Sequence, residues 1–204
     1  DSIWVGQNYG KTWQRWESPA QVPLLDVGEL PTPSSAKRPS IYIGSERVGI
    51  FKTQNNGQSY DRVGVPGATL YDITLSSDEK GPVLMAGIEW DTYRTPLPTQ
   101  KRLDASTFDR GSSDKEGYFG ARAALLASSP EHPNVVYKTV VVDPVDTFNV
   151  LRSEDGGKTW EMLTKGSETP YAILVHPANP DHIYISYWSL LGSGLLVSRD
   201  GGEN

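Results

Sequence analysis

Short apolar runs recur along the chain, and each follows a polar turn that contains proline. Such runs begin at Ile41, Val83, Val135 and Ile183, with separations of 42, 52 and 48 residues. Another apolar segment precedes each turn, so every unit reads as apolar start, polar turn and short apolar run. Because two extended segments flank a turn each time, the pattern predicts a β-hairpin that is repeated four times.

The last complete unit indicates how the strands follow one another. Residues 171–177 and 182–188 predict its first two strands, and residues 194–200 predict the third. Residues 158–164 predict the fourth strand of the preceding unit. Glycine and proline punctuate the whole chain, which argues for many short strands and against long helices.

A second pattern keeps the same phase as the first. Residues 153–160 read SEDGGKTW, and residues 53–60, 6–13 and 198–204 read TQNNGQSY, GQNYGKTW and SRDGGEN. The common template is a small or hydroxyl residue, x, Asp or Asn, x, Gly, x, x, aromatic. The Asp or Asn positions lie 47, 100 and 45 residues apart, so the middle interval spans two units and one unit has lost its motif. Two patterns with one period indicate a repeat architecture.

The motif Ser153-x-Asp155-x-Gly157-x-x-Trp160 resembles the Asp-box, also called the BNR repeat. Asp-boxes occur in β-propellers of sialidases, xyloglucanase-type endoglucanases, sortilin-type receptors and photosystem II assembly factors; the paired segments HPANPDHIYIS and GLLVSRDGG most resemble the last three groups. The resemblance covers nearly the whole chain except residues 92–122. It implies an all-β fold, a β-propeller of four-stranded antiparallel blades. The residues at Asp-box positions are Asn8, Gly10, Trp13, Asn55, Gly57, Tyr60, Ser153, Asp155, Gly157, Trp160, Ser198, Asp200 and Gly202.

The Asp-box residues are expected to stabilise their own hairpins. Asp155 can accept hydrogen bonds from backbone N–H groups of its turn, Ser153 can add a hydroxyl hydrogen bond, and Gly157 can adopt positive φ. Trp160 is expected to pack flat between neighbouring sheets. The motif lacks the several carboxylates and the terminal Glu of a Ca²⁺ loop. We therefore predict a structural motif that binds no metal.

The repeats predict approximate blade units at residues 1–19, 20–65, 66–122, 123–166 and 167–204, with a polar insertion at 92–122. About four blades are fewer than the resembled families use to close a propeller. A partial propeller would leave two apolar blade faces exposed. We therefore expect the chain to belong to a larger propeller, in which further blades of a parent chain or a covering partner contact these faces.

Composition excludes several kinds of partner. The net charge is −6, and no basic stripe interleaves with aromatic residues, so no nucleic-acid partner is expected. No run of 18 apolar residues is present that would span a bilayer. Cysteine is absent, which excludes disulfides and thiolate metal sites but leaves the compartment open. We expect a secreted, periplasmic or otherwise extracytoplasmic protein.

Strand order sorts the connections onto two faces. The turns between strands one and two share a face with the Asp-boxes, and the loops from strand two to three and from four to one share the other. Propeller ligands usually meet this second face, an expectation by analogy of fold. The insertion is long and polar, as functional loops often are. The candidate ligand-binding residues on this face are Trp90, Tyr93, Arg94, Asp146, Tyr187 and Trp188.

A glycoside hydrolase would need two carboxylates that flank a sugar bond, about 5 to 9.5 Å apart. Among the carboxylates Glu89, Asp91, Asp143 and Asp146, we predict Asp91 and Asp143 as the catalytic pair, and Trp90 and Trp188 as residues that stack on sugar rings. The alternative is that the carboxylates cap turns and that the tryptophans pack between blades. A sialidase is not favoured, because the Arg-Ile-Pro signature is absent.

Two functions therefore stay open. The first is a non-catalytic binding or scaffold module for a protein or glycan ligand, as in sortilin-like and assembly-factor propellers. The alternative is a xyloglucanase-like hydrolase that acts on β-glucans. His132, His176 and His182 fall in turns without a zinc pattern, and no glycine-rich phosphate loop is present, so no metal or cofactor is expected.

Overall fold

The computed structural model describes residues 2–19, 24–29, 40–45, 47–64, 70–88, 91–97, 109–110, 121–142, 147–166, 168–189 and 192–204. The regular elements in these ranges are all β-strands, and none of the described residues forms a helix that could cross a membrane. The strands are β1 (Ser2–Gln7), β2 (Thr12–Glu17), β3 (Leu24–Glu29), β4 (Ile41–Ser45), β5 (Gly49–Thr53), β6 (Asp61–Gly64), β7 (Leu70–Asp78), β8 (Gly81–Ile88), β9 (Asp91–Pro96), β10 (Asp109–Arg110), β11 (Ala121–Ser128), β12 (Val136–Val142), β13 (Thr147–Ser153), β14 (Glu161–Gly166), β15 (Thr169–His176), β16 (Asn179–Ser189) and β17 (Gly192–Ser198).

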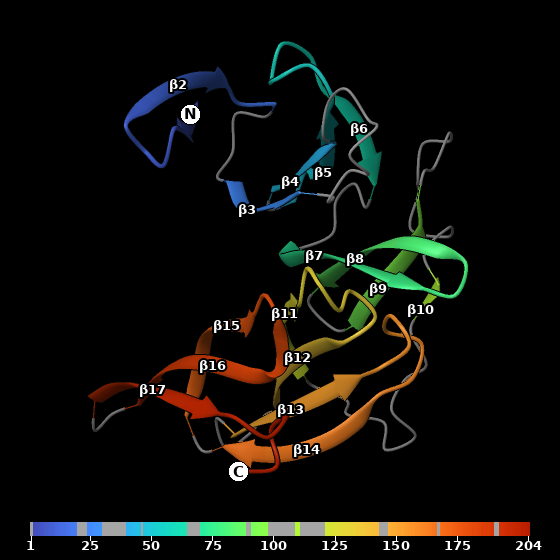
Figure 1. Cartoon of the computed structure of the whole chain (residues 1–204), viewed down its shortest axis with the longest axis vertical. Helices are drawn as coiled ribbons and strands as arrows, with labels where there is room; N and C mark the ends of the chain where they lie inside the picture. The colour runs from blue at the N-terminus through green and yellow to red at the C-terminus, as the bar shows by residue number, and fades with distance from the viewer. Residues whose placement is uncertain are drawn as a thin grey trace.

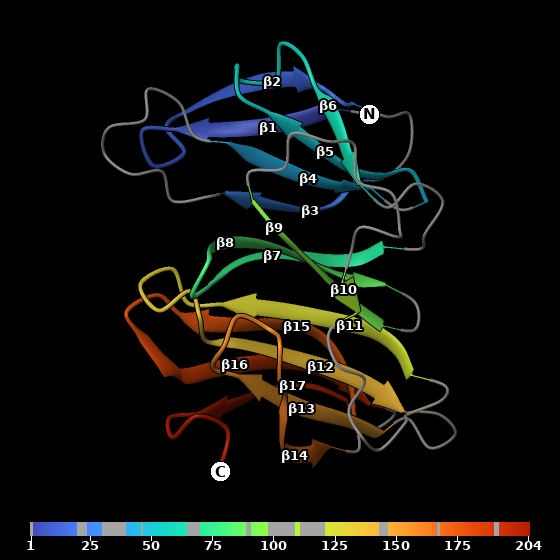
Figure 2. The ribbon, with the colours of Figure 1, turned by 90° about the vertical axis from the view of Figure 1, so that its right-hand side faces the viewer.

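These strands form five antiparallel sheets, named A to E in chain order. Sheet A contains β1 and β2, sheets B, C and D contain β3–β6, β7–β10 and β11–β14, and sheet E contains β15–β17. Within each sheet, strands adjacent in sequence are adjacent in space. The sheets stack in succession (Figure 2) along an arc that has sheets A and E at its two ends (Figure 1). Since the first strands of sheets B to E contact one another, they form the inner side of the arc.

The second strand of each of sheets B, C and D is buried on both sides. In β8, Val83, Leu84, Met85 and Ala86 are all fully buried, although successive side chains point to opposite faces of the sheet. A strand covered on both faces has a continuous apolar sequence rather than an alternating one. This burial explains why the short apolar runs of the sequence mark the second strand of each unit.

A separate apolar cluster fills each junction among sheets B to E. Tyr42 of sheet B packs with Leu70 and Leu84 of sheet C, and Met85 of sheet C packs with Val136 of sheet D. The cluster between sheets D and E contains Tyr137, Phe148, Val150, Ile173, Ile183 and Ile185. The prediction of an all-β fold is confirmed, and the predicted four-stranded antiparallel blades are present as sheets B, C and D; among the described residues sheets A and E have two and three strands.

Part of the segment without a recognisable motif belongs to a sheet. Within residues 92–122, most of β9 and all of β10 supply the third and fourth strands of sheet C. The two-residue strand β10 pairs with β9 through Asp109–Arg94 and Arg110–Tyr93. Sheet C therefore has four strands although its hairpin lacks the repeated turn sequence.

Candidate functional site

The two ends of each sheet carry different connections. We call the end with the strand 1–2 and strand 3–4 turns the turn face, and the opposite end the loop face. In sheets D and E these turns meet through main-chain hydrogen bonds, from Gly156 N–H to Asn134 C=O (3.0 Å) and from Gly201 N–H to Asp181 C=O (2.9 Å). The predicted placement of both kinds of turn on one face is confirmed for these two sheets.

Ser153 and Asp155 close the turn that follows β13. Ser153 Oγ donates to Asp155 Oδ1 (2.8 Å) and accepts from Gly157 N–H (2.8 Å). Asp155 Oδ1 accepts from Lys158 and Thr159 N–H (2.9 Å each), and Oδ2 accepts from the Thr159 hydroxyl (2.6 Å). Burial raises the pKa of Asp155, but these hydrogen bonds outweigh it and hold the pKa below its usual value. The carboxylate is therefore engaged by its own turn.

The same arrangement recurs in sheets B and E. Ser198 Oγ donates to Asp200 Oδ1 (2.7 Å), as Ser153 does in its own turn. In sheet B, Thr53 Oγ1 donates to Asn55 Oδ1 (3.0 Å). Because the amide oxygen of Asn55 takes the place of a carboxylate oxygen, the turn requires a hydrogen-bond acceptor rather than a charge.

The turn of sheet A departs from this pattern. Gly6 stands at the position of Ser153 and has no hydroxyl to accept a turn N–H. The strands β1 and β2 instead pair as far as Gln7, while Lys11 N–H donates to Asn8 C=O (3.3 Å) as Gln58 N–H does to Asn55 C=O in sheet B (3.4 Å). The prediction for Asn8, Gly10 and Trp13 stays a prediction: Gly10 has the positive φ of the other template glycines (+79°), but the turn lacks the hydroxyl group. Trp13 is 62% exposed in the described structure.

In sheets B, D and E the glycine two residues after the Asp or Asn of the turn touches the preceding sheet. These glycines have φ between +74° and +97°, a region that disfavours residues with a side chain. A Cβ atom at any of them would also collide with a large side chain of the sheet before. The contacts are Gly57 with Trp16, Gly157 with Met85 and Gly202 with Leu163.

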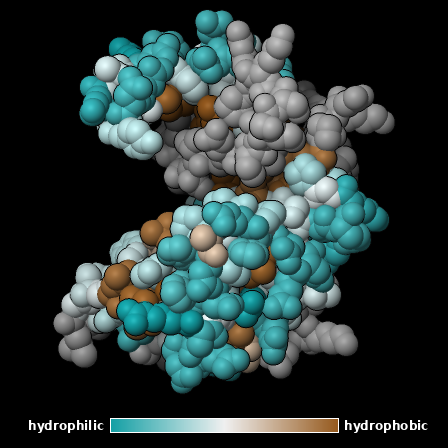
Figure 3. All heavy atoms as spheres, viewed as in Figure 1, coloured by the Kyte–Doolittle hydropathy of each residue, from teal (hydrophilic) through white to brown (hydrophobic). Residues whose placement is uncertain are grey.

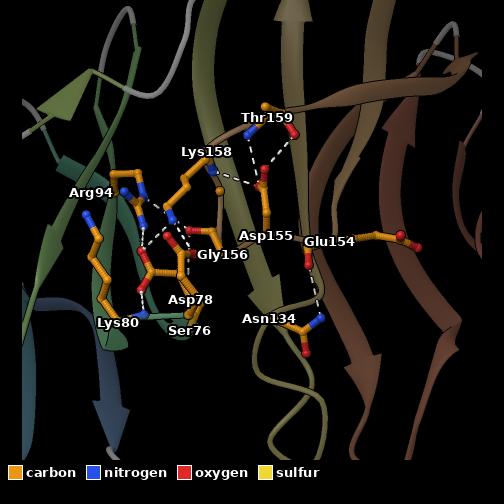
Figure 4. Close-up of polar contacts among 12 residues, drawn as sticks. Ser76, Asp78, Lys80, Arg94, Asn134, Glu154, Asp155, Gly156, Lys158 and Thr159 are labelled. Atoms are coloured by element: carbon orange, nitrogen blue, oxygen red, sulfur yellow. Dashed lines mark hydrogen bonds and ion pairs between the residues drawn. The ribbon is translucent and has the colours of Figure 1, made fainter.

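A buried polar cluster joins sheets C and D at the turn face (Figure 4). Arg94 Nη2 donates to Asp78 Oδ2 (2.7 Å), and Arg94 Nε donates to Gly156 C=O (3.2 Å). Both side chains of the Arg94–Asp78 ion pair are almost fully buried. Lys158 forms ion pairs with Asp78 (3.2 Å) and with Glu79. Arg94 thus ties the strand 1–2 turn of sheet C to the strand 3–4 turn of sheet D.

The charges of this cluster are fixed by their partners. Burial raises the pKa of Asp78, but hydrogen bonds from Arg94, Lys80 N–H and Lys158 overcome that effect and bring the pKa to about 2. The hydrogen bond to Glu79 raises the pKa of Lys158. A carboxylate that stays ionised down to such a low pH is poorly matched to proton transfer near neutrality. The cluster is therefore suited to holding two sheets together.

Two predicted ligand-binding residues do not face the loop side. Arg94 belongs to the cluster at the turn face, and Tyr93 is 8% exposed and packs into the apolar cluster between sheets B and C. The physical reason is the alternation of β9, which pairs Tyr93 with Ala86 and Arg94 with Met85 on opposite faces of sheet C. The prediction for Tyr93 and Arg94 is corrected: both residues stabilise junctions between sheets.

The predicted catalytic pair is only partly covered by the described residues. Asp91 is the first residue of β9 and pairs with Ile88, which places its backbone at the loop-face end of sheet C. The other candidate carboxylates and one candidate tryptophan lie outside the described residues; they are Glu89, Trp90, Asp143 and Asp146. The catalytic pair of Asp91 and Asp143 therefore stays a prediction.

Aromatic side chains gather at the loop-face end of sheet E. Thr169 of β15 pairs with Trp188 of β16, and Pro170 pairs with Tyr187. An irregularity in β15 between Pro170 and Ala172 leaves Tyr171 unpaired and 66% exposed. Trp188 is 44% exposed, whereas the Tyr187 ring lies on Gly194. We call Tyr171, Tyr187 and Trp188 the aromatic group.

Comparison with known proteins supports the architecture. No family model and no curated protein matches the chain. Among solved structures, a GH74 enzyme from Niastella koreensis matches 97% of this chain and 33% of its own length at 14% identity and a TM-score of 0.65. A GH74 xyloglucanase from Xanthomonas campestris matches 85% and 26% at 18% identity and a TM-score of 0.56. The fold is a β-propeller.

A third similar structure is a propeller with a different role. YCF48 bound to D1 peptide matches all of this chain and 59% of its own length, at 12% identity and a TM-score of 0.56. The chain thus spans a third or less of the two GH74 proteins and less than two thirds of YCF48. Glycoside hydrolases and a peptide-bound protein therefore share this propeller fold, and identities this low show the fold alone.

The sequence patterns missed a register irregularity in the first strand of several sheets. The first strands of sheets B to E all have a register irregularity near their start, at residues 25, 71, 123 and 171. In sheet C the residue after the irregularity, Asp72, accepts hydrogen bonds from Ile73 N–H (2.8 Å) and from Leu126 N–H of sheet D (2.7 Å). An aspartate within an otherwise apolar strand was the sequence signal that could have indicated this irregularity. β-Bulges often redirect side chains at barrel rims and active sites.

The described residues contain no group of three or more His, Cys, Asp or Glu side chains that could hold a metal ion. His176 and His182 lie at the turn face of sheet E, with ring centroids 5.9 Å apart in an edge-to-face arrangement. His176 Nδ1 accepts a hydrogen bond from Ala178 N–H (3.2 Å). This contact engages one ring nitrogen of the pair in its own turn.

Proposed function

We propose that this chain is an Asp-box β-propeller module that binds a protein or glycan ligand at its loop face. The observation that carries the proposal is the aromatic group at the loop-face end of sheet E. Aromatic rings that keep one face open can stack on sugar rings or receive apolar side chains of a peptide. The turn face, in contrast, is occupied by hydrogen bonds that close turns and by the Arg94 cluster.

The aromatic side chains at the loop face of sheet E are suited to contacts with sugar rings or peptide side chains. Tyr187 is held on Gly194, where any side chain would displace its ring. Trp188 follows on the other side of β16 and stays 44% exposed. The unpaired residue Tyr171 projects from the neighbouring strand. The exposed rings of Tyr171 and Trp188 lose little conformational freedom on binding, because Trp and Tyr have few rotatable bonds.

Calorimetric titration of the chain with xyloglucan oligosaccharides and with unstructured peptides tests the proposal. We expect Trp188→Ala to weaken binding of the active probe about tenfold or more, which equals about 1.4 kcal/mol. Trp4→Ala is the matched control, because Trp4 is 59% exposed on sheet A, at the far end of the arc, and should leave the affinity unchanged. Equal effects of both substitutions, or no binding of any probe, would contradict the proposal.

The alternative function is a glycoside hydrolase that acts on β-glucans of the xyloglucan type. Its specific support is the position of Asp91, which begins β9 at the loop-face end of sheet C, together with the fold shared with GH74 enzymes. Release of reducing sugar from xyloglucan would distinguish this function from simple binding. Loss of that release in both Asp91→Ala and Asp143→Ala would favour the hydrolase, whereas hydrolysis that persists in both would exclude this catalytic pair.

A further inference from the structure

The strand 3–4 turn of sheet B contains the dipeptide Asn56–Gly57, which the other copies of the turn sequence lack. Of the seven asparagines in the chain, Asn56 alone precedes a glycine. In sheets D and E the position of Asn56 is held by Gly156 and Gly201. Asn56 is exposed, and the described surface at the end of the arc that carries sheet A and this turn is largely hydrophilic in Figure 3. Asn56 is therefore accessible to water.

An asparagine that precedes a glycine can react with its own main chain. The Gly57 nitrogen, once it has lost its proton, attacks the side-chain carbonyl carbon of Asn56; the new C–N bond closes a five-membered succinimide, the bond to the amide nitrogen breaks, and ammonia leaves with the proton. Water then opens the ring at either carbonyl and gives aspartate or isoaspartate. The reaction consumes water, releases ammonia and needs no oxidant or cofactor. Glycine favours the attack because it has no Cβ atom beside the nitrogen.

The folded turn opposes this ring closure in two ways. Gly57 N–H donates to Thr53 Oγ1 (3.1 Å), which stabilises the protonated form of the nitrogen that must lose its proton. Asn56 has φ +57°, in the left-handed region where ψ is about +30° to +60°. A succinimide ring holds its asparagine at a different ψ, because the nitrogen of the next residue must reach the side-chain carbon. The reaction therefore requires the turn to open.

Sheet A covers the turn from the other side. The Trp16 ring lies so close to Gly57 that a Cβ atom at this glycine would collide with it. Trp16 is 6% exposed, and the Tyr60 hydroxyl at the end of the turn sequence donates to Glu17 C=O of β2 (2.8 Å). The turn is thus held between Thr53 within its own hairpin and Trp16 of the neighbouring sheet. Opening of the turn therefore disturbs the junction between sheets A and B.

We propose that Asn56–Gly57 is a deamidation site that reacts when the junction between sheets A and B opens. Both products place a new carboxylate in the turn, and isoaspartate also lengthens the main chain by one carbon. A lengthened turn cannot keep Gly57 N–H on Thr53 Oγ1 and Gly57 under Trp16 at the same time. The modification therefore converts a transient opening of sheet A into a permanent one. It does not depend on the aromatic group of sheet E, which lies at the other end of the arc.

Peptide mapping by mass spectrometry tests the proposal on the 204-residue chain, incubated at mildly alkaline pH with and without unfolding concentrations of urea. Labelling with an isoaspartate-specific methyltransferase detects the isoaspartate product. In urea we expect both products at Asn56, formed faster as pH rises. In the folded chain the same reaction should be at least about tenfold slower, which corresponds to an opening free energy of about 1.4 kcal/mol or more.

Substitutions on the two sides of the turn separate local opening from a general loss of stability. Trp16→Ala and Thr53→Ala should each raise the rate in the folded chain by about threefold or more, and Trp16→Ala should leave the rate in urea unchanged. Hydrogen exchange of β4 and β5 shows whether sheet B stays folded in these variants. Ser153→Ala removes the corresponding hydroxyl of sheet D and is the matched control, which should leave the rate at Asn56 unchanged. Asn56→Gly copies the turns of sheets D and E and should abolish the reaction.

Four results would overturn the proposal. The first is a rate at Asn56 that is the same in the folded chain and in urea. The second is a rate in the folded chain that neither Trp16→Ala nor Thr53→Ala changes. The third is formation of aspartate without isoaspartate, since direct hydrolysis of the side chain would then be the reaction. The fourth is a deamidated chain in which the amides of β1 and β2 exchange as slowly as in the unmodified chain.

Discussion

One hydroxyl oxygen organises the strand 3–4 turn of each of sheets B, D and E. Ser153 Oγ accepts Gly157 N–H and donates to Asp155, and Thr53 and Ser198 do the same in their sheets. In sheet A, where Gly6 stands at the hydroxyl position, strand pairing continues to Gln7 and Thr12. The hydroxyl therefore selects the turn geometry, and the Asp or Asn side chain stabilises it.

Substitution of Asp155 tests, at the residue scale, whether its side chain stabilises the turn by hydrogen bonding or by charge. Asp155→Asn should lower the free energy of unfolding by less than about 0.5 kcal/mol, because an amide can accept the same N–H groups and can donate to Thr159, as Asn55 Nδ2 donates to Ser59 (2.7 Å). Asp155→Ala leaves those N–H groups without an acceptor and should cost about 1–2 kcal/mol. Urea unfolding of the three proteins measures both values. Equal destabilisation by Asn and Ala would show that the negative charge is needed.

At the scale of elements, the junction between sheets C and D depends on an ion pair that acid should weaken. The pKa of Asp78 is about 2 in the folded chain, below an unfolded value near 3.9. A lowered pKa contributes stability that is complete above the unfolded value and disappears as pH falls through the folded value. The stabilisation by Asp78 should therefore be present above pH 4 and decline between about pH 4 and 2.

Asp78→Asn tests this acid dependence. The variant should be less stable than the parent at pH 7, and the difference should shrink as pH falls from 4 toward 2, measured by thermal unfolding over a pH series. Glu161→Gln, which changes an exposed carboxylate of β14, is the control and should follow the parent curve. A difference that stays constant down to pH 2 would mean that the carboxylate charge of Asp78 does not stabilise the junction.

The elements were predictable where their signals are local. Alternation and turn chemistry over a few residues identified the hairpins around Ile41, Val135 and Ile183, because strand pairing across a short turn depends mainly on neighbouring sequence. The role of Arg94 was missed because its partners, Asp78 and Gly156, come from different hairpins and meet it only through stacking of sheets. Of the aromatic group, Tyr187 and Trp188 were candidates from the sequence, but the irregularity that exposes Tyr171 has no sequence signature.

At the scale of the whole molecule, the main contacts between described strands of different sheets join neighbouring sheets, as in other repeat proteins, and stability should vary along the arc. Sheet C is covered on both sides, and Leu84 and Met85 in β8 are fully buried. Sheet A has two strands and covers only one neighbour, and its Trp4 and Trp13 are largely exposed. Such a gradient favours partial opening from an end rather than a single global transition.

Native-state hydrogen exchange tests the gradient directly. Amides of β1 and β2 should exchange through openings of lower free energy than amides of β8 and β12, because opening sheet A exposes one junction whereas freeing sheet C exposes two. Leu126→Ala removes a side chain that is 4% exposed at the junction of sheets C and D, and it should lower protection in β8 and β12 by about 2–3 kcal/mol. The same variant should leave exchange in β1 and β2 unchanged if those strands open on their own. Equal opening free energies in β2 and β8, lowered together by Leu126→Ala, would instead show that the five sheets unfold as one cooperative unit.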